Sequence, residues 1–129
     1  MIDFPSKKIN NKTYINIYKS KDLADNQGRR IRFHDDEDQQ VAIFRHKGKL
    51  YCLWNICPHR HQDQIHNGII RDGKVSCPIH GWTYWLDSGD NINPHQGLKN
   101  LDKYDIFEED GEIWIEQPEV KIPKWRQSD

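Results

Sequence analysis

Two short peptides, Cys57-Pro58-His59 and Cys77-Pro78-Ile79-His80-Gly81-Trp82, decide how this chain is interpreted. Each peptide offers one thiol and one imidazole, and seventeen residues (60–76) separate the two peptides. Thiolates and imidazoles are the side chains that bind iron and zinc in proteins. The two peptides therefore predict a metal centre held by two sulfur and two nitrogen donors.

Two kinds of centre use this donor set. In one form of [2Fe–2S] cluster, two histidines replace two cysteines on one of the irons. A structural zinc site also takes two cysteines and two histidines, but it normally has the cysteines together and the histidines together. Here the order alternates, with a long gap between the pairs. We therefore favour a [2Fe–2S] cluster, and a zinc-stabilised interaction module stays as the less favoured alternative.

The spacing C-x-H-x(15–17)-C-x-x-H resembles that of the Rieske proteins, and the resemblance covers about residues 13–116. It implies that Cys57 and Cys77 bind the inner iron as thiolates. It also implies that His59 and His80 bind the outer iron through Nδ1, on two loops that close over the cluster from opposite sides. His61 and His66 fit the ligand spacing less well than His59 does, and His61 stands where the family usually has glycine.

The resemblance also implies roles for residues next to the expected ligands. Gly81 has no Cβ and would let the backbone approach the cluster closely. Trp82 follows it where high-potential members have a serine. Tyr84 either donates its hydroxyl to a cysteine sulfur or packs in the core. Residues 93–98, with Pro94, form either a third loop that covers the cluster or an ordinary surface turn.

Differences from the high-potential members of the family also affect the expected reduction potential. The disulfide that links the cluster loops in high-potential members would fall at Gln62 and Ile79, so this chain lacks it. The serine donor to a bridging sulfide is missing as well. We therefore expect a potential near the low end of the Rieske range, about −150 mV.

Strand patterns along the chain predict an all-β fold. Alternating or short apolar runs between turn residues are typical of a sandwich or barrel. The resemblance narrows this to stacked antiparallel β-sheets with a small cluster-binding subdomain at about residues 55–98, within a single domain over residues 1–129. We expect strands at residues 13–18, 29–34, 41–44, 50–55, 69–71, 74–76, 83–86, 103–107 and 112–116.

Local signals add detail to this fold. Ser20 is expected to cap a short helical turn, and the apolar run 41–44 is expected to lie centrally in its sheet. Asp72-Gly73 predicts a hairpin turn. Cys52 alternates with neighbouring apolar residues and is expected to be a buried structural thiol. The tail, residues 117–129, is expected to pack loosely or extend.

Composition excludes some classes of function. The 129 residues carry a formal net charge of −1, so no basic field favours nucleic acid. The N-terminus has no signal-like apolar stretch, and no run approaches the roughly 20 apolar residues of a membrane helix. We therefore expect no membrane and a cytoplasmic location.

The resemblance implies a ferredoxin that carries one electron through its cluster. Its donor would be a flavoprotein reductase, and its acceptor a terminal oxygenase or other oxidoreductase. The alternative is a component of a larger enzyme, such as the small subunit of an assimilatory nitrite reductase or part of a multicomponent oxygenase. The mononuclear iron motif Asp-x-x-His-x₄-His is absent from the sequence, so the chain is not expected to be an oxygenase by itself.

Overall fold

The computed structural model describes residues 4–56, 63–78, 81–92 and 100–121. These residues contain ten strands and two short 3₁₀ turns, joined by loops. In chain order they are β1 Ser6–Ile9, β2 Lys12–Lys19, η1 Ser20–Asp22, β3 Gln27–Arg32, β4 Gln40–His46, β5 Lys49–Trp54, η2 Ile65–Asn67, β6 Ile69–Arg71, β7 Lys74–Ser76, β8 Thr83–Trp85, β9 Ile106–Glu109 and β10 Glu112–Glu116.

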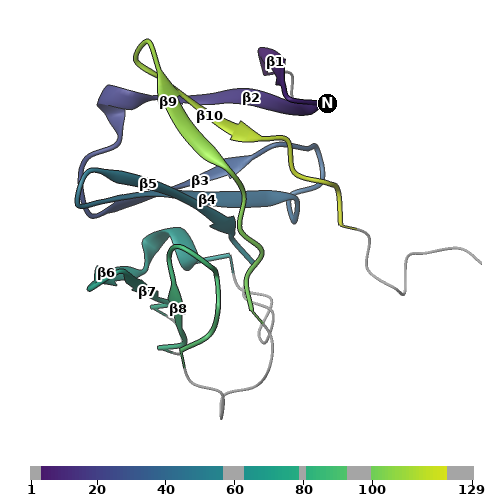
Figure 1. Ribbon diagram of the computed structural model, residues 1–129. Helices are drawn as coiled ribbons and strands as arrows, with labels where there is room; N and C mark the ends of the chain where they lie inside the picture. The colour runs from purple at the N-terminus through teal and green to yellow at the C-terminus, as the bar shows by residue number, and fades with distance from the viewer. Residues whose placement is uncertain (1–3, 57–62, 79–80, 93–99, 122–129) are drawn as a thin grey trace, which may run out of the picture.

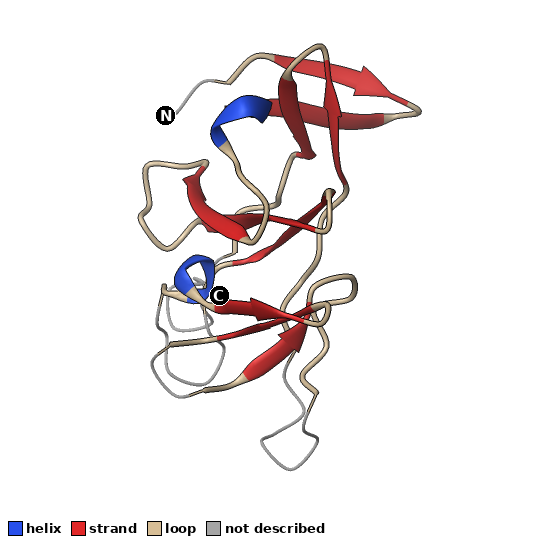
Figure 2. Ribbon diagram, turned by 90° about the vertical axis from the view of Figure 1, so that its left-hand side faces the viewer, coloured by secondary structure: helices blue, strands red, loops and turns tan. Residues whose placement is uncertain are grey.

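The strands form three antiparallel sheets that lie one above another (Figure 1). The outer sheet has the order β1-β2-β10-β9, the middle sheet β3-β4-β5, and the small sheet β6-β7-β8. The turn η2 contacts β3 and β4 and lies between the middle and small sheets (Figure 2). The predicted all-β fold of stacked antiparallel sheets is confirmed, and the described residues contain no α-helix.

The middle sheet separates two hydrophobic cores. Along β4, Val41 and Ile43 belong to the core shared with the outer sheet, whereas Ala42 and Phe44 belong to the core shared with the small sheet. All four side chains are fully buried. A strand covered on both faces is apolar at consecutive positions, because neither face meets water. The central position predicted for this run is confirmed.

The core between the outer and middle sheets contains the predicted structural thiol. Cys52 on β5 is 2% exposed and lies in this core with Ile113 and Ile115 of β10. Burial raises the pKa of the Cys52 thiol well above its ordinary value, because an apolar interior disfavours the thiolate. Cys52 is therefore a neutral packing group, as expected.

Several hairpins have the turn that their sequence predicts. At Asp72-Gly73 the backbone φ values are 52° and 78°, and at Asp110-Gly111 they are 53° and 78°. Positive φ at both central residues is typical of type I′ turns, whose twist matches that of the paired strands. Asp72-Gly73 joins β6 to β7, as expected from the sequence.

Two local features differ from the expectations. Strand β1 was not predicted, although Asn10 and Asn11 between β1 and β2 have positive φ and are a residue type that tolerates it. Ser20 is not the helix cap: Lys19 precedes the turn, which has no side-chain cap. The Ser20 hydroxyl instead contacts Glu108. Glu108 also forms an ion pair with Arg45 of β4 at 3.0 Å, so the Ser20 hydroxyl joins this pair rather than capping the turn.

The start of the tail is held more firmly than expected. The Gln39 side chain donates from Nε2 to the Lys121 carbonyl and accepts the Lys121 amide at Oε1, each at 2.7 Å. Gln39 is buried, and so is Pro118. Residues 117–121 are therefore fixed against the start of β4. The remainder of the predicted tail lies outside the described residues.

The small sheet is also tied to the middle sheet by a polar contact. His46, at the end of β4, is buried. Its Nε2 accepts the Gly73 amide at 3.1 Å, and its Nδ1 lies 2.7 Å from the Asn26 side-chain oxygen. Because Nε2 accepts, the imidazole donates from Nδ1, which defines one neutral tautomer.

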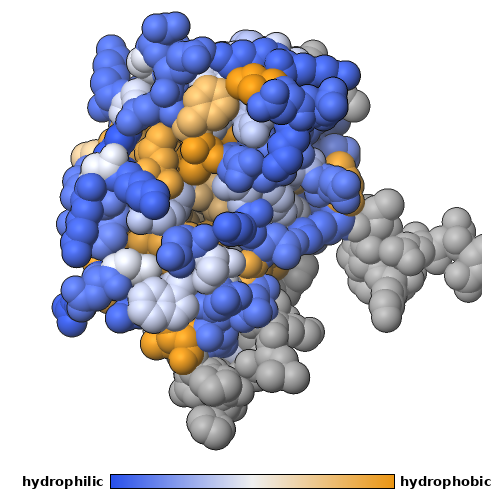
Figure 3. All heavy atoms as spheres, in the orientation of Figure 1, coloured by the Kyte–Doolittle hydropathy of each residue, from blue (hydrophilic) through white to orange (hydrophobic). Residues whose placement is uncertain are grey.

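Figure 3 shows a face that is mostly hydrophilic, with apolar groups gathered in a few patches. Over the described part of the chain, no helix has the length and apolar character that a membrane crossing needs.

Candidate metal centre

The second ligand peptide begins directly after β7. Cys77 is 2% exposed, carries a free thiol and belongs to the core between the middle and small sheets. Its amide donates to the Trp82 carbonyl at 2.7 Å, and its carbonyl accepts the Gly81 amide at 2.9 Å. Ser76 and Thr83, the last and first residues of the paired strands, face each other across this loop. The two strands thus hold Cys77 at the base of a narrow loop.

Gly81 has a backbone reason to be glycine. Its φ is +71°, in the left-handed region that side chains with a Cβ rarely adopt. A Cβ added at this position would meet no atom within 4 Å in the described part of the chain. The structure therefore explains this glycine by the turn itself, and its expected close approach to a cluster stays a prediction.

The aromatic residues after Gly81 pack beneath the loop. Trp82 is half-buried and packs against the core that contains Cys77. Tyr84 on β8 is completely buried in that core. Of the two roles considered for Tyr84, core packing is confirmed. A hydrogen bond from its hydroxyl to a cysteine sulfur stays a prediction.

The other expected ligands, Cys57, His59 and His80, lie outside the described residues, and so does Pro94. Among the described residues, no group of three or more metal-binding side chains occurs. Cys77 can be assessed: it provides a buried thiol of the soft-donor type that iron–sulfur clusters require, at the position the motif assigns to it. The chemistry of the donor set fits a [2Fe–2S] cluster.

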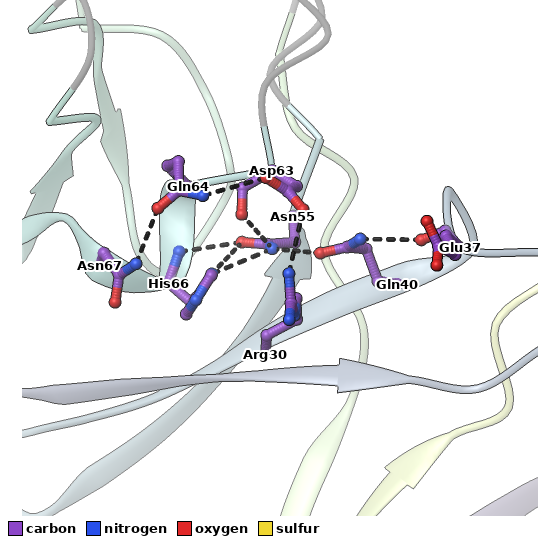
Figure 4. Close-up of polar contacts among 8 residues, drawn as sticks. All are labelled: Arg30, Glu37, Gln40, Asn55, Asp63, Gln64, His66 and Asn67. Carbon is purple, nitrogen blue, oxygen red and sulfur yellow. Dashed lines mark hydrogen bonds and ion pairs between the residues drawn. The ribbon is translucent and has the colours of Figure 1, made fainter.

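Residues before and after the segment 57–62 in the sequence form a polar network (Figure 4). Its centre is Asn55, which follows β5 and is 0% exposed. The Asn55 amide nitrogen donates to the Asp63 carbonyl at 3.0 Å, and its side-chain oxygen accepts the His66 backbone amide at 2.8 Å. The same nitrogen contacts Gln40 on β4. Asn55 thus connects the residues before and after this segment to the middle sheet.

His66 is part of this network. Its Nδ1 lies 3.1 Å from the Asn55 amide nitrogen. Burial lowers the pKa of His66, and the nearby Arg30 guanidinium lowers it further. His66 is therefore favoured as a neutral imidazole with its Nδ1 against the Asn55 side-chain amide. The preference for His59 over His66 as a ligand stays a prediction.

Sequence reasoning missed the roles of Asn55 and His46. Asn55 was expected only as the end of a strand, and His46 was not among the expected site residues. An amide flanked by apolar residues, as in Trp54-Asn55-Ile56, is a signal that could have identified Asn55, because a buried amide needs hydrogen-bond partners.

Comparison with known families identifies the domain that this chain contains. Residues 13–105 match the model of the Rieske [2Fe-2S] domain, and the chain belongs to this family. The Rieske domain binds a [2Fe–2S] cluster. The expectation of this cofactor is therefore confirmed.

In three curated relatives, the matching region makes up very different shares of the whole protein. Chlorophyllide a oxygenase of rice is 33% identical over 67% of this chain, which spans 17% of that enzyme. The ferredoxin component of the alkene monooxygenase system of Xanthobacter autotrophicus is 26% identical over 63% of this chain and 64% of its own length. Nitrite reductase of Emericella nidulans is 36% identical over 65% of this chain, which spans 8% of the enzyme.

Solved structures share the fold. A ferredoxin of Sphingomonas yanoikuyae B1 gives a TM-score of 0.69 at 18% identity, over 81% of this chain and 98% of that chain. A chain in a complex of oxygenase and ferredoxin of carbazole 1,9a-dioxygenase gives 0.71 at 16% identity, over 84% and 97%. In that system, the ferredoxin forms a complex with its oxygenase.

Proposed function

We propose that this chain is a Rieske-type ferredoxin, a one-electron carrier whose cluster is bound by Cys57, His59, Cys77 and His80. The observation that carries the proposal is the position of Cys77, a buried free thiol at the base of a loop closed by its own backbone. The complete Cys-x-His and Cys-x-x-His set within the family match supports the other three ligands.

The role as a carrier also needs partners. We propose a flavoprotein reductase as the electron donor and a terminal oxygenase or other oxidoreductase as the acceptor, with all of them in the cytoplasm. The relative that serves as the ferredoxin component of an alkene monooxygenase system supports this arrangement. The known complex between a ferredoxin and its oxygenase supports it further.

The surface near Cys77 suits contact with another protein. Ile69, which pairs with Ser76, and Ile92, whose amide donates to the Thr83 carbonyl, are 65% and 42% exposed, and Ser76 and Thr83 are the strand ends on either side of the Cys77 loop. Exposed apolar side chains beside a redox centre favour short-lived docking, because burying them on contact offsets part of the cost of association.

A component of a larger enzyme is the second candidate. The sequence similarity to nitrite reductase favours it, since a domain of this kind forms a small part of that enzyme. A stable complex with a sirohaem enzyme would support this candidate. Rapid reduction by a flavoprotein, followed by dissociation, would support the carrier.

Absorbance, EPR and metal analysis of the purified protein test the proposal. We expect two irons and two acid-labile sulfides per chain, with an EPR signal that appears on reduction. A colourless protein with one zinc per chain and no EPR signal would refute the proposal and support the zinc-stabilised module.

A further inference from the structure

Asn55 connects β4 with residues that follow the first ligand peptide in the sequence. It lies two residues before Cys57, and its contacts reach Asp63 and His66 beyond the segment 57–62. It also reaches Gln40, a buried residue of β4. The described residues on the two sides of the segment in the sequence therefore meet at one side chain (Figure 4).

Only an amide suits these contacts. The Asp63 carbonyl and the Gln40 side-chain oxygen accept hydrogen bonds, whereas the His66 backbone amide donates one. A carboxylate would have no donor for the two oxygens, and an aliphatic side chain would leave all these groups unpaired. Because Asn55 is fully buried, water does not replace a lost partner at this site.

Two other polar contacts at the edge of the network are exposed to solvent and contribute less to holding it together. Arg30 and Asp63 form an ion pair at 3.0 Å, but both side chains are well exposed, so solvent screens the attraction. The Asn67 side chain donates to Gln64 at 2.7 Å on the surface. The buried amide of Asn55 is therefore the stronger link between residues 63–66 and the middle sheet.

We propose that Asn55 is a positioning residue of the cluster, which fixes the loop bearing Cys57 and His59 in the geometry that the irons require. This inference rests on the proposed function and its ligand assignment. Groups that orient metal ligands without touching the metal change metal retention and electronic properties when they are altered.

Asn55→Asp in the cluster-loaded protein tests the inference, because it keeps the shape and removes the two donors. We expect cluster loss to a chelator to be about tenfold faster, with a changed EPR g-value pattern and a shifted reduced fraction at fixed applied potential. Gln40→Met removes the anchor on β4 together with the Gln40 donation to the Glu37 carbonyl. It should shift each quantity in the same direction by less, and it serves if the first variant does not fold.

Two controls separate positioning from general stability. Asn67→Ala removes an exposed amide at the edge of the same network, and Ile113→Val weakens a distant core. We expect both to keep the wild-type EPR pattern and chelator rate. If Asn55→Asp and Gln40→Met also keep them, the inference is wrong while the proposed function stands. A wild-type protein that binds no iron–sulfur cluster would instead refute the proposed function.

Discussion

Cys52 and Cys77 are equally buried, yet they belong to different cores and have different expected roles. Cys52 packs between the outer and middle sheets, whereas Cys77 begins a ligand loop. We expect Cys52→Ala to keep the visible spectrum and to cost about 1 kcal/mol of stability. Cys77→Ala should abolish the cluster spectrum, since one iron loses a thiolate. Equal cluster content in the two variants would contradict the ligand assignment.

His66 should make stability depend on pH. Its pKa in the folded protein is lowered from 6.5 by burial, so the unfolded chain binds the proton more readily. The free energy of unfolding should therefore be at its full value above pH 6.5 and fall as the pH drops below it. Urea unfolding between pH 8 and 5 measures this effect. His66→Gln should flatten the dependence, and an unchanged slope would exclude His66 as its source.

At the scale of elements, two glycines in turns have the same backbone but different surroundings. Gly73 and Gly89 both have φ of +78°. A Cβ at Gly73 would lie 3.9 Å from Trp85, whereas one at Gly89 would lie 2.0 Å from the Leu101 carbonyl oxygen. We expect Gly73→Ala to cost about 1–2 kcal/mol, from backbone conformation alone.

Gly89→Ala should cost more than this, about 3 kcal/mol or more, because the Leu101 backbone must also move. Thermal unfolding of both variants beside wild type provides the comparison. Gly48→Ala is a second control, since it has the same φ and no described atom within 4 Å of the added Cβ. Equal losses at all three positions would show that the Leu101 contact has no energetic weight.

Elements with strong local signals were predictable from the sequence. The Asp72-Gly73 hairpin and the buried run of β4 followed from turn chemistry and from apolar residues at consecutive positions. The role of Ser20 was not predictable, because its hydroxyl serves a contact with Glu108, which is distant in sequence. The link between Gln39 and Lys121 was missed for the same reason.

The ligand set of the candidate metal site is a prediction from residue types, whereas the polar network beside it was not expected from the sequence. The ligand spacing and the turn at Gly81 are local properties of the sequence. The contacts of Asn55 join β4, the end of β5 and η2, and no local pattern brings these segments together. Long-range polar contacts of this kind depend on how the sheets stack.

For the whole molecule, the reduction potential is the property that most directly reports the cluster environment. Trp82 occupies the place of the serine donor, and Gln62 and Ile79 occupy the expected disulfide positions. We expect a midpoint of about −150 mV, near the low end of the Rieske range. A redox titration followed by EPR measures it, and a clearly positive midpoint would contradict this expectation.

The contact between His46 and Gly73 has a consequence for protein engineering. The imidazole comes from β4, yet it accepts an amide in the turn between β6 and β7. A chimera that transplanted only residues 55–92 into a foreign scaffold would leave that turn without its acceptor. The smallest portable version of this electron-transfer module must therefore carry the strand that supplies His46.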